Sequence, residues 1–139
     1  MAEYDPDNIF GKVIKGEIPS HKVFEDDDTL AFMDIMPMSR GHVLVIPKTG
    51  SRNLLDADPQ VLANLIQKTQ RVARAAMAAM EADGVRIMQF NEAAAGQTVF
   101  HLHFHILPMY EGVALKSHTG EMADADELAA HAEKIRAEL

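Results

Sequence analysis

The clearest pattern in the chain is helical and lies between residues 58 and 84. Apolar positions recur there with a period near 3.6, as in an amphipathic helix, at Val61, Leu62, Leu65, Ile66, Val72, Ala73, Ala76, Met77 and Met80. Asp58 and Pro59 form a typical helix start, because the aspartate accepts from free N–H groups and the proline lacks one. Gly84 is a natural stop. The pattern predicts one long helix.

Short apolar runs elsewhere predict about five strands, at residues 21–24, 29–33, 42–47, 85–90 and 100–107. Turn-forming loops separate them, at residues 25–28, 37–41 and 91–98. A helix over residues 8–15, capped by Asp7, and a C-terminal stripe complete the pattern; the stripe consists of Leu128, Ala132, Ile135 and Leu139. We therefore expect an α+β fold, an antiparallel meander with one long helix and short N- and C-terminal helices.

Length and composition narrow the function. The chain has 139 residues, which favours a single domain over residues 1–139. Its net charge of -8 repels nucleic acid and anionic membranes, so we expect neither as a partner. No apolar run approaches the roughly 18 residues of a membrane span, and the acidic start is unlike a secretory signal. The absence of cysteine excludes disulfides and thiolate catalysis, and we expect a cytoplasmic protein.

Histidines at alternate positions, His101, His103 and His105, are the most unusual feature of the sequence. In a strand they would share one face, about 6.6–6.8 Å apart, while the apolar residues between them face the core. Polar rings on an otherwise apolar strand cost stability unless each finds a partner. This conflict between pattern and stability indicates a functional site.

Three interpretations of these histidines are open from the residues alone. The first is a set of structural histidines with satisfied hydrogen bonds, the second is a metal site, and the third is a nucleophilic catalyst. The catalytic interpretation leads, because a histidine with a pKa of about 6.5 is largely neutral at pH 7 and has a free lone pair. If its Nδ1–H donates to a carbonyl, Nε2 becomes the nucleophile.

The residues just before the histidines suit such a site. Gly96 lets the backbone approach a ligand closely, and Gln97 and Thr98 offer neutral donors to a charged transition state. By pattern alone, His42 is a core or turn residue.

Polar residues elsewhere in the chain are weaker candidates for the site. Asp34 is either a turn cap or an acceptor for ribose hydroxyls, and Asn91 has the same ambiguity. The remaining histidines lack supporting context and are interpreted as surface residues: His21, His118 and His131.

The segment His101-Leu102-His103-Phe104-His105-Ile106-Leu107 resembles the signature of the histidine triad (HIT) superfamily, and the chain is most similar to its Hint-like branch. The resemblance covers residues 8 to 110 as ordered motifs, among them Asn8–Ile14, Gly16–Pro19, Leu30–Ile35, Gly41–Lys48 and Gly96–Val99. It implies an α+β meander in a homodimer whose paired sheets form one continuous sheet. Residues 111–139 are expected to be a C-terminal extension with a helix.

The resemblance implies a hydrolase or transferase that acts on purine nucleoside phosphoramidates, such as an AMP joined to an amine. His103 would attack the α-phosphate to form a nucleotidyl-histidine, which water then cleaves. The carbonyl of His101 would orient His103. His105 would contact the phosphate and the leaving group, and His42 would complete the histidine cluster.

The resemblance also implies the nucleotide contacts. Asp34 would bind the ribose hydroxyls, and Asn91 would assist at the phosphate. The purine would be enclosed by Phe10, Phe32 and Ile35, and the phosphate lined by Gly96, Gln97 and Thr98, with Thr98 near the leaving group.

Two departures from the family pattern alter these expectations. Many bacterial relatives have cysteines at the positions of Asn8 and Gly11 and a histidine near Gly50, which hold a structural zinc with the first triad histidine. We therefore expect no metal and no cofactor. The loop before the triad is less glycine-rich than in the eukaryotic Hint pattern, and Gln97-Thr98 also occurs in dinucleoside polyphosphate hydrolases. That activity, and a nucleotide-binding regulatory protein with vestigial catalysis, are the alternatives.

Overall fold

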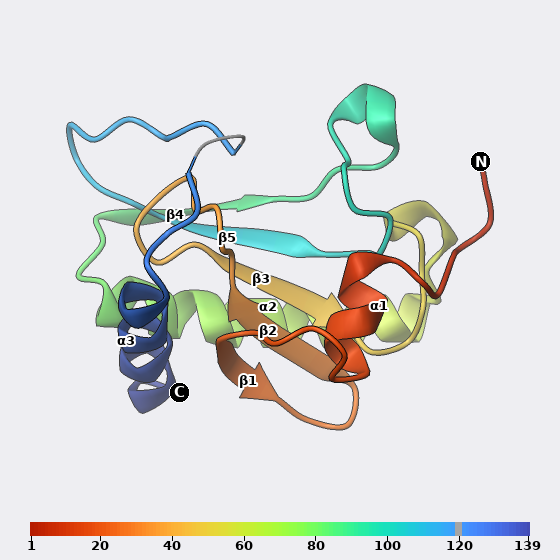
Figure 1. Cartoon of the computed structure of the whole chain (residues 1–139), viewed down its shortest axis with the longest axis horizontal. Helices are drawn as coiled ribbons and strands as arrows, with labels where there is room; N and C mark the ends of the chain where they lie inside the picture. Colours follow the sequence, from red (N-terminus) through yellow and green to blue (C-terminus); the bar gives the residue numbers. More distant parts are fainter. Residues whose placement is uncertain (119–120) are drawn as a thin grey trace.

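An antiparallel sheet of five strands forms the centre of the computed structural model, which describes residues 1–118 and 121–139 (Figure 1). The strands are β1 (Lys22–Glu25), β2 (Thr29–Met33), β3 (Val43–Pro47), β4 (Gly84–Met88) and β5 (Phe104–Met109). Their order is β1-β2-β3-β5-β4, so β5 inserts between β3 and β4 and the sheet is not a simple meander. The α+β prediction with antiparallel strands is confirmed.

Helices cover both faces of the sheet. The predicted long helix is α2 (Pro59–Ala79), which lies behind the sheet in Figure 1, while α1 (Ile9–Ile14) lies in front. The C-terminal helix α3 (Ala125–Ala137) contacts α2, β1 and β2. Within the described residues, no helix has the length and apolarity needed to cross a membrane.

The two faces of β2 and β3 pack against different layers because side chains alternate along a strand. One core cluster joins Ala31, Met33, Val43 and Val45 to α2 and α3. The other joins Leu30, Phe32, Leu44 and Ile46 to Phe10 and Val13 of α1. His105 is the cross-strand partner of Leu44, so it lies on the α1 face.

The start of β5 differs from its prediction at residue 100. The backbone N–H of Leu102 donates to the carbonyl of Ser51 over 2.8 Å, outside the sheet, and pairing with β3 begins only at Phe104. His101 and His103 therefore precede the strand, and only His105 lies within it. The predicted strand start is therefore wrong, but the predicted alternation holds. Leu102 and Ile106 pack in the core cluster with α2. The rings of His101 and His103 lie towards Phe10, on the α1 face.

Smaller corrections concern the helices. Asn8, and not Asp7, caps α1, because its side chain accepts from the N–H of Gly11. The helix α2 ends at Ala79, and Gly84 opens β4 instead of terminating the helix. His131, expected at the surface, is buried on the inner side of α3 with 7% of its surface exposed.

Candidate active site

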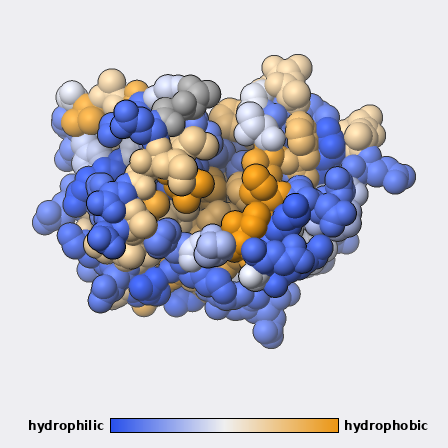
Figure 2. Space-filling view, in the orientation of Figure 1, coloured by the Kyte–Doolittle hydropathy of each residue, from blue (hydrophilic) through white to orange (hydrophobic). Residues whose placement is uncertain are grey.

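A pocket of about 410 Å³, hereafter the triad pocket, opens on the α1 face of the sheet. Figure 2 shows this side of the molecule, hollowed at its centre with apolar side chains along the walls. The pocket is lined by residues that include Phe10, Val13, Phe32, Asp34, Ile35, Leu44, Phe90, Gly96, Thr98, His103, His105 and His118. The structure thus brings together eight of the predicted site residues: Phe10, Phe32, Asp34, Ile35, Gly96, Thr98, His103 and His105.

Among the residues that the structure describes, only one ring nitrogen of His103, Nδ1, has a hydrogen-bond partner. Its Nδ1 lies 2.6 Å from the carbonyl oxygen of His101, and a carbonyl only accepts, so Nδ1 carries the proton. Nε2 therefore has the lone pair. The ring packs edge-on against Phe10, with centroids 4.9 Å apart, and burial lowers its pKa. The neutral ring is the form that can act as a nucleophile.

His101 lies behind the pocket and is fully buried. Its Nε2 donates to the carbonyl oxygen of Pro47 over 2.8 Å, so its Nδ1 is an acceptor. The hydroxyl of Tyr4 donates to that Nδ1, also over 2.8 Å. Both ring nitrogens of His101 are thus bound, which holds the backbone carbonyl that orients His103.

His42 and His105 form a second directed pair. The backbone N–H of Met38 donates to Nδ1 of His42 over 3.1 Å, so the proton of the neutral His42 ring is on Nε2. That Nε2 donates to Nδ1 of His105 over 2.9 Å, which leaves an N–H at Nε2 of His105. Burial, with the neighbouring histidines, lowers the pKa of His42 to about 2 and that of His105 to about 3. Both rings are therefore neutral, and His105 presents a donor.

His118 is part of the site, although it was expected at the surface. Its Nε2 donates to Oδ2 of Asp34 over 2.7 Å and closes a contact between residues 84 positions apart. Asp34 is buried, and its Oδ1 accepts from the N–H of Met36 over 2.8 Å. The sequence around His118 has no local motif that could have revealed this contact, because it depends on the path of the chain after β5.

Ligand atoms of Asp34, His42 and His105 all lie within 4.8 Å of one another, a spacing that a metal ion could use. Nε2 is the nitrogen of His42 that faces Asp34 and His105, so a metal bound between these three residues would need the lone pair of Nε2. The His42 proton would then move to Nδ1 and face the N–H of Met38, donor against donor. The geometry therefore favours a hydrogen-bond chain, and the absence of metal stays a prediction.

The ring of Tyr4 lies next to Gly50, near which the resemblance implies a zinc-binding histidine in many bacterial relatives. A Cβ at Gly50 would come within 2.4 Å of the Tyr4 ring, so the absence of a side chain at residue 50 makes room for this tyrosine. Its hydroxyl meets the same histidine, His101, that the resemblance links to zinc. Tyr4 was not among the predicted site residues, and its isolated position near the N-terminus carries no motif.

Two predicted phosphate contacts have other roles in the structure. The side chain of Gln97 is buried, donates to the carbonyls of Arg52 and Val99 and accepts from the N–H of Glu92. Asn91 accepts from the N–H of Leu54. Neither side chain lines the triad pocket. Both hold the loop in shape, and this loop positions Gly96, with φ of +103°, and Thr98.

Comparisons with known proteins agree with this geometry. The family model of the HIT domain matches residues 15–112. A HIT-like protein of Mycobacterium tuberculosis is 42% identical over 118 residues, which cover 85% of this chain and 82% of that protein. The adenylylsulfatase HINT3 of Arabidopsis thaliana is 40% identical over 105 residues, 76% of this chain and 53% of that protein.

Solved structures extend the agreement to almost the whole chain. A Hit-like protein from Bartonella henselae, described as involved in cell-cycle regulation, superposes with a TM-score of 0.96 at 54% identity, covering 99% of this chain and all of the other. A hypothetical histidine triad nucleotide-binding protein from Sulfolobus tokodaii superposes with a TM-score of 0.84 at 32% identity, covering 91% of this chain and 88% of the other. The chain therefore belongs to the HIT family.

Proposed function

We propose that this protein hydrolyses or transfers the nucleotidyl group of purine nucleotide conjugates of the phosphoramidate type, with His103 as nucleophile. The observation that carries the proposal is the hydrogen bond of 2.6 Å from His103 Nδ1 to the carbonyl of His101. It fixes the tautomer whose Nε2 lone pair is available, on a ring that lines the triad pocket.

The chemistry follows from the protonation of the rings. Nε2 of His103 attacks the α-phosphorus, the bond from phosphorus to nitrogen breaks with its electron pair on nitrogen, and the amine leaves with the proton of the Thr98 hydroxyl. Water then attacks the same phosphorus and returns a proton to the Thr98 oxygen, the bond to Nε2 breaks with its electron pair on Nε2, and the nucleotide is released. The N–H at Nε2 of His105 donates to a phosphate oxygen as negative charge builds up, and we assign the protonation of the leaving group to Thr98, which lines the pocket.

The walls of the pocket suit a purine nucleoside. Phe10 and Phe32 form an edge-on pair with centroids 5.5 Å apart, and Ile35 adds an apolar side chain that is 45% exposed. Flat apolar walls with few polar groups favour a planar base. Asp34, which precedes Ile35 in the chain, also lines the pocket, and we assign it to the ribose hydroxyls.

One relative and one side chain bear on the class of substrate. The relative named an adenylylsulfatase supports a conjugate of a single nucleotide. The alternative of a dinucleoside polyphosphate hydrolase arose from the pair Gln97-Thr98 and from the less glycine-rich loop before the triad. Thr98 lines the pocket, whereas the side chain of Gln97 is bound within its own loop. We therefore rank the phosphoramidate above the dinucleotide.

We also propose that two copies pair through β4. This strand is an edge of the sheet, and its Ile87 is 42% exposed. An unpaired edge with exposed apolar side chains is a typical site for a second strand. Pairing of two β4 strands would join the two sheets into one, as the resemblance implies.

The test is release of AMP from an adenosine 5′-phosphoramidate. The wild type should turn over the substrate, and His103→Ala should abolish turnover while the far-UV spectrum is unchanged. His21→Ala is the matched control, because His21 does not line the pocket, and it should retain full activity. Unchanged turnover in His103→Ala would exclude the mechanism. Tight AMP binding without turnover of any conjugate would instead support the regulatory alternative.

A further inference from the structure

The segment that follows β5 turns back over the molecule and ends at the triad pocket. This return segment, residues 110–118, turns at Gly112, which has a φ of +75°, and is the light-blue loop in Figure 1. Most of its residues are exposed. The contacts at its end include the N–H of Lys116, which donates to the carbonyl of Met38 over 2.7 Å, and His118, which donates to Asp34.

The contact with His118 occupies the carboxylate that the proposed function needs. Asp34 is the one carboxylate among the described residues that line the triad pocket. Its Oδ1 accepts a hydrogen bond from the N–H of Met36, and its Oδ2 accepts one from Nε2–H of His118. Nε2 of His42 also lies 3.6 Å from Oδ2. Each oxygen of Asp34 can accept a second hydrogen bond, but only 4% of the residue is exposed and His118 is bonded to Oδ2. We therefore expect a ribose diol to reach Asp34 only when His118 moves away.

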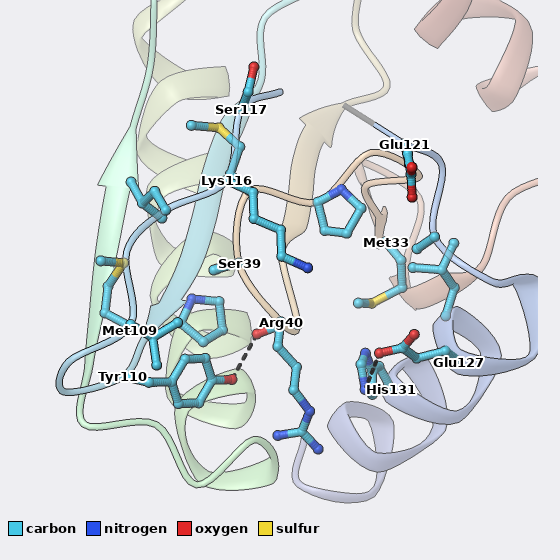
Figure 3. A pocket seen from close by; sticks show the side chains of 18 of the residues that line it. Met33, Ser39, Arg40, Met109, Tyr110, Lys116, Ser117, Glu121, Glu127 and His131 are labelled. Atoms are coloured by element: carbon cyan, nitrogen blue, oxygen red, sulfur yellow. Dashed lines mark hydrogen bonds and ion pairs between the residues drawn. The ribbon is translucent and has the colours of Figure 1, made fainter. Parts of the chain in front are cut away.

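Most residues of the return segment between 110 and 118 are exposed, so displacing His118 removes few buried contacts within this part of the chain. A second cavity, of about 870 Å³, is lined by the return segment, by α3 and by the loop after β2, to which Lys116 is hydrogen-bonded. Figure 3 shows Lys116 and Ser117 on one side of this cavity and Met33 and His131 on the other. A segment with few buried contacts opens at low free-energy cost.

We propose that His118 is a specificity-determining residue, which competes with the ribose diol of the substrate for Asp34. The inference rests on the proposed function, because it takes the ribose to bind at Asp34. A ligand that brings two hydroxyls can replace the His118 hydrogen bond, whereas a sugar without them leaves Asp34 paired with His118. The affinity for a ribonucleotide is therefore lowered by the free energy of the His118–Asp34 bond.

The experiment compares the dissociation constants of AMP and 2′,3′-dideoxy-AMP by calorimetry. Removal of a hydrogen bond to a charged group should raise the affinity of His118→Ala for AMP about tenfold. The affinity for the dideoxy nucleotide should stay within about twofold, since that ligand does not need Asp34. His118→Gln keeps a side-chain N–H and should lie between wild type and alanine. Val113→Ala, an exposed position of the same segment, is the matched control and should bind both ligands as the wild type does.

The possible outcomes separate the two claims. Unchanged or weaker AMP binding in His118→Ala, or equal gains for both nucleotides, would overturn the competition while leaving the proposed function intact. If no variant binds AMP at all, the proposed nucleotide site is wrong, and the competition is overturned with it. A gain confined to AMP, with His118→Gln in between, supports the proposal.

Discussion

The hydroxyl of Tyr4 lies 2.8 Å from Nδ1 of His101 and connects residues 97 positions apart. It completes a chain of contacts that runs from the N-terminal segment through the His101 ring and carbonyl to Nδ1 of His103. The proposed nucleophile is thus linked through His101 to a tyrosine that lies against Gly50, near which the resemblance implies a zinc-binding histidine in other bacterial members.

Tyr4→Phe should weaken both stability and catalysis. It leaves the buried His101 Nδ1 without a donor, which costs about 1–3 kcal/mol of unfolding free energy. Because Tyr4 acts through His101, we expect kcat to fall severalfold with little change in KM. Tyr110→Phe is the matched control: its hydroxyl donates to the carbonyl of Arg40, outside the triad pocket. Urea unfolding and steady-state kinetics of the two variants test this, and equal effects would contradict the account.

Gly50→Ala should reproduce the effect of Tyr4→Phe without touching any polar group. The added Cβ would lie 2.4 Å from the Tyr4 ring and push the ring out of place. Gly84→Ala is the control, because a Cβ there meets nothing within 4 Å. We expect reduced kcat for Gly50→Ala and wild-type kcat for Gly84→Ala; full activity in both would show that Tyr4 does not position the triad.

Stability should fall as the pH drops below about 6.5. In the folded chain the pKa values of His42 and His105 are lowered to about 2 and about 3, whereas in the unfolded chain they return to the ordinary value, 6.5. Above pH 6.5 neither state takes up protons at these rings; below it only the unfolded chain does. Each ring then contributes a loss of up to about 1.4 kcal/mol per pH unit. Urea unfolding between pH 7.5 and 5 measures the slope, and a flat profile would contradict neutral burial.

Thr98→Val should slow only reactions with a poor leaving group. The substitution removes the hydroxyl but keeps the shape, and general acid catalysis is worth about 10²–10⁴-fold where a leaving group needs a proton. Alkylamine conjugates of AMP should therefore lose far more rate than conjugates of a weakly basic aromatic amine. Thr98→Ser should retain activity on both. Equal losses for both substrate types would remove Thr98 from this role.

Local patterns predicted much of the fold. The long helix appears as a 3.6-residue period from Pro59 onward, and the buried strands β2 and β3 appear as apolar runs. The boundary of β5 was wrong because the backbone of Leu102 bonds to Ser51, a tertiary contact that strand propensity does not register. The order of β4 and β5 in the sheet likewise depends on where α2 crosses, which no local signal specifies.

The site was predictable where one motif contained it. His103 and His105 line the pocket that the sequence motif indicated. Tyr4 and His118 were missed, because each reaches the site from a segment with no motif of its own. Gln97 shows the opposite error: its residue type suits a phosphate, but its side chain is bound within its loop. Residue type and spacing identified candidate chemistry, while the hydrogen-bond partners decided its use.

The most direct test of the central claim is to trap the covalent intermediate. Wild-type protein mixed with an adenosine phosphoramidate and quenched in alkaline denaturant, which preserves the bond from phosphorus to nitrogen, should carry one adenylyl group in mass spectra. Fragmentation should place it on His103, and His103→Ala should carry none. An adduct on His101 or His105, or turnover in His103→Ala, would contradict the account.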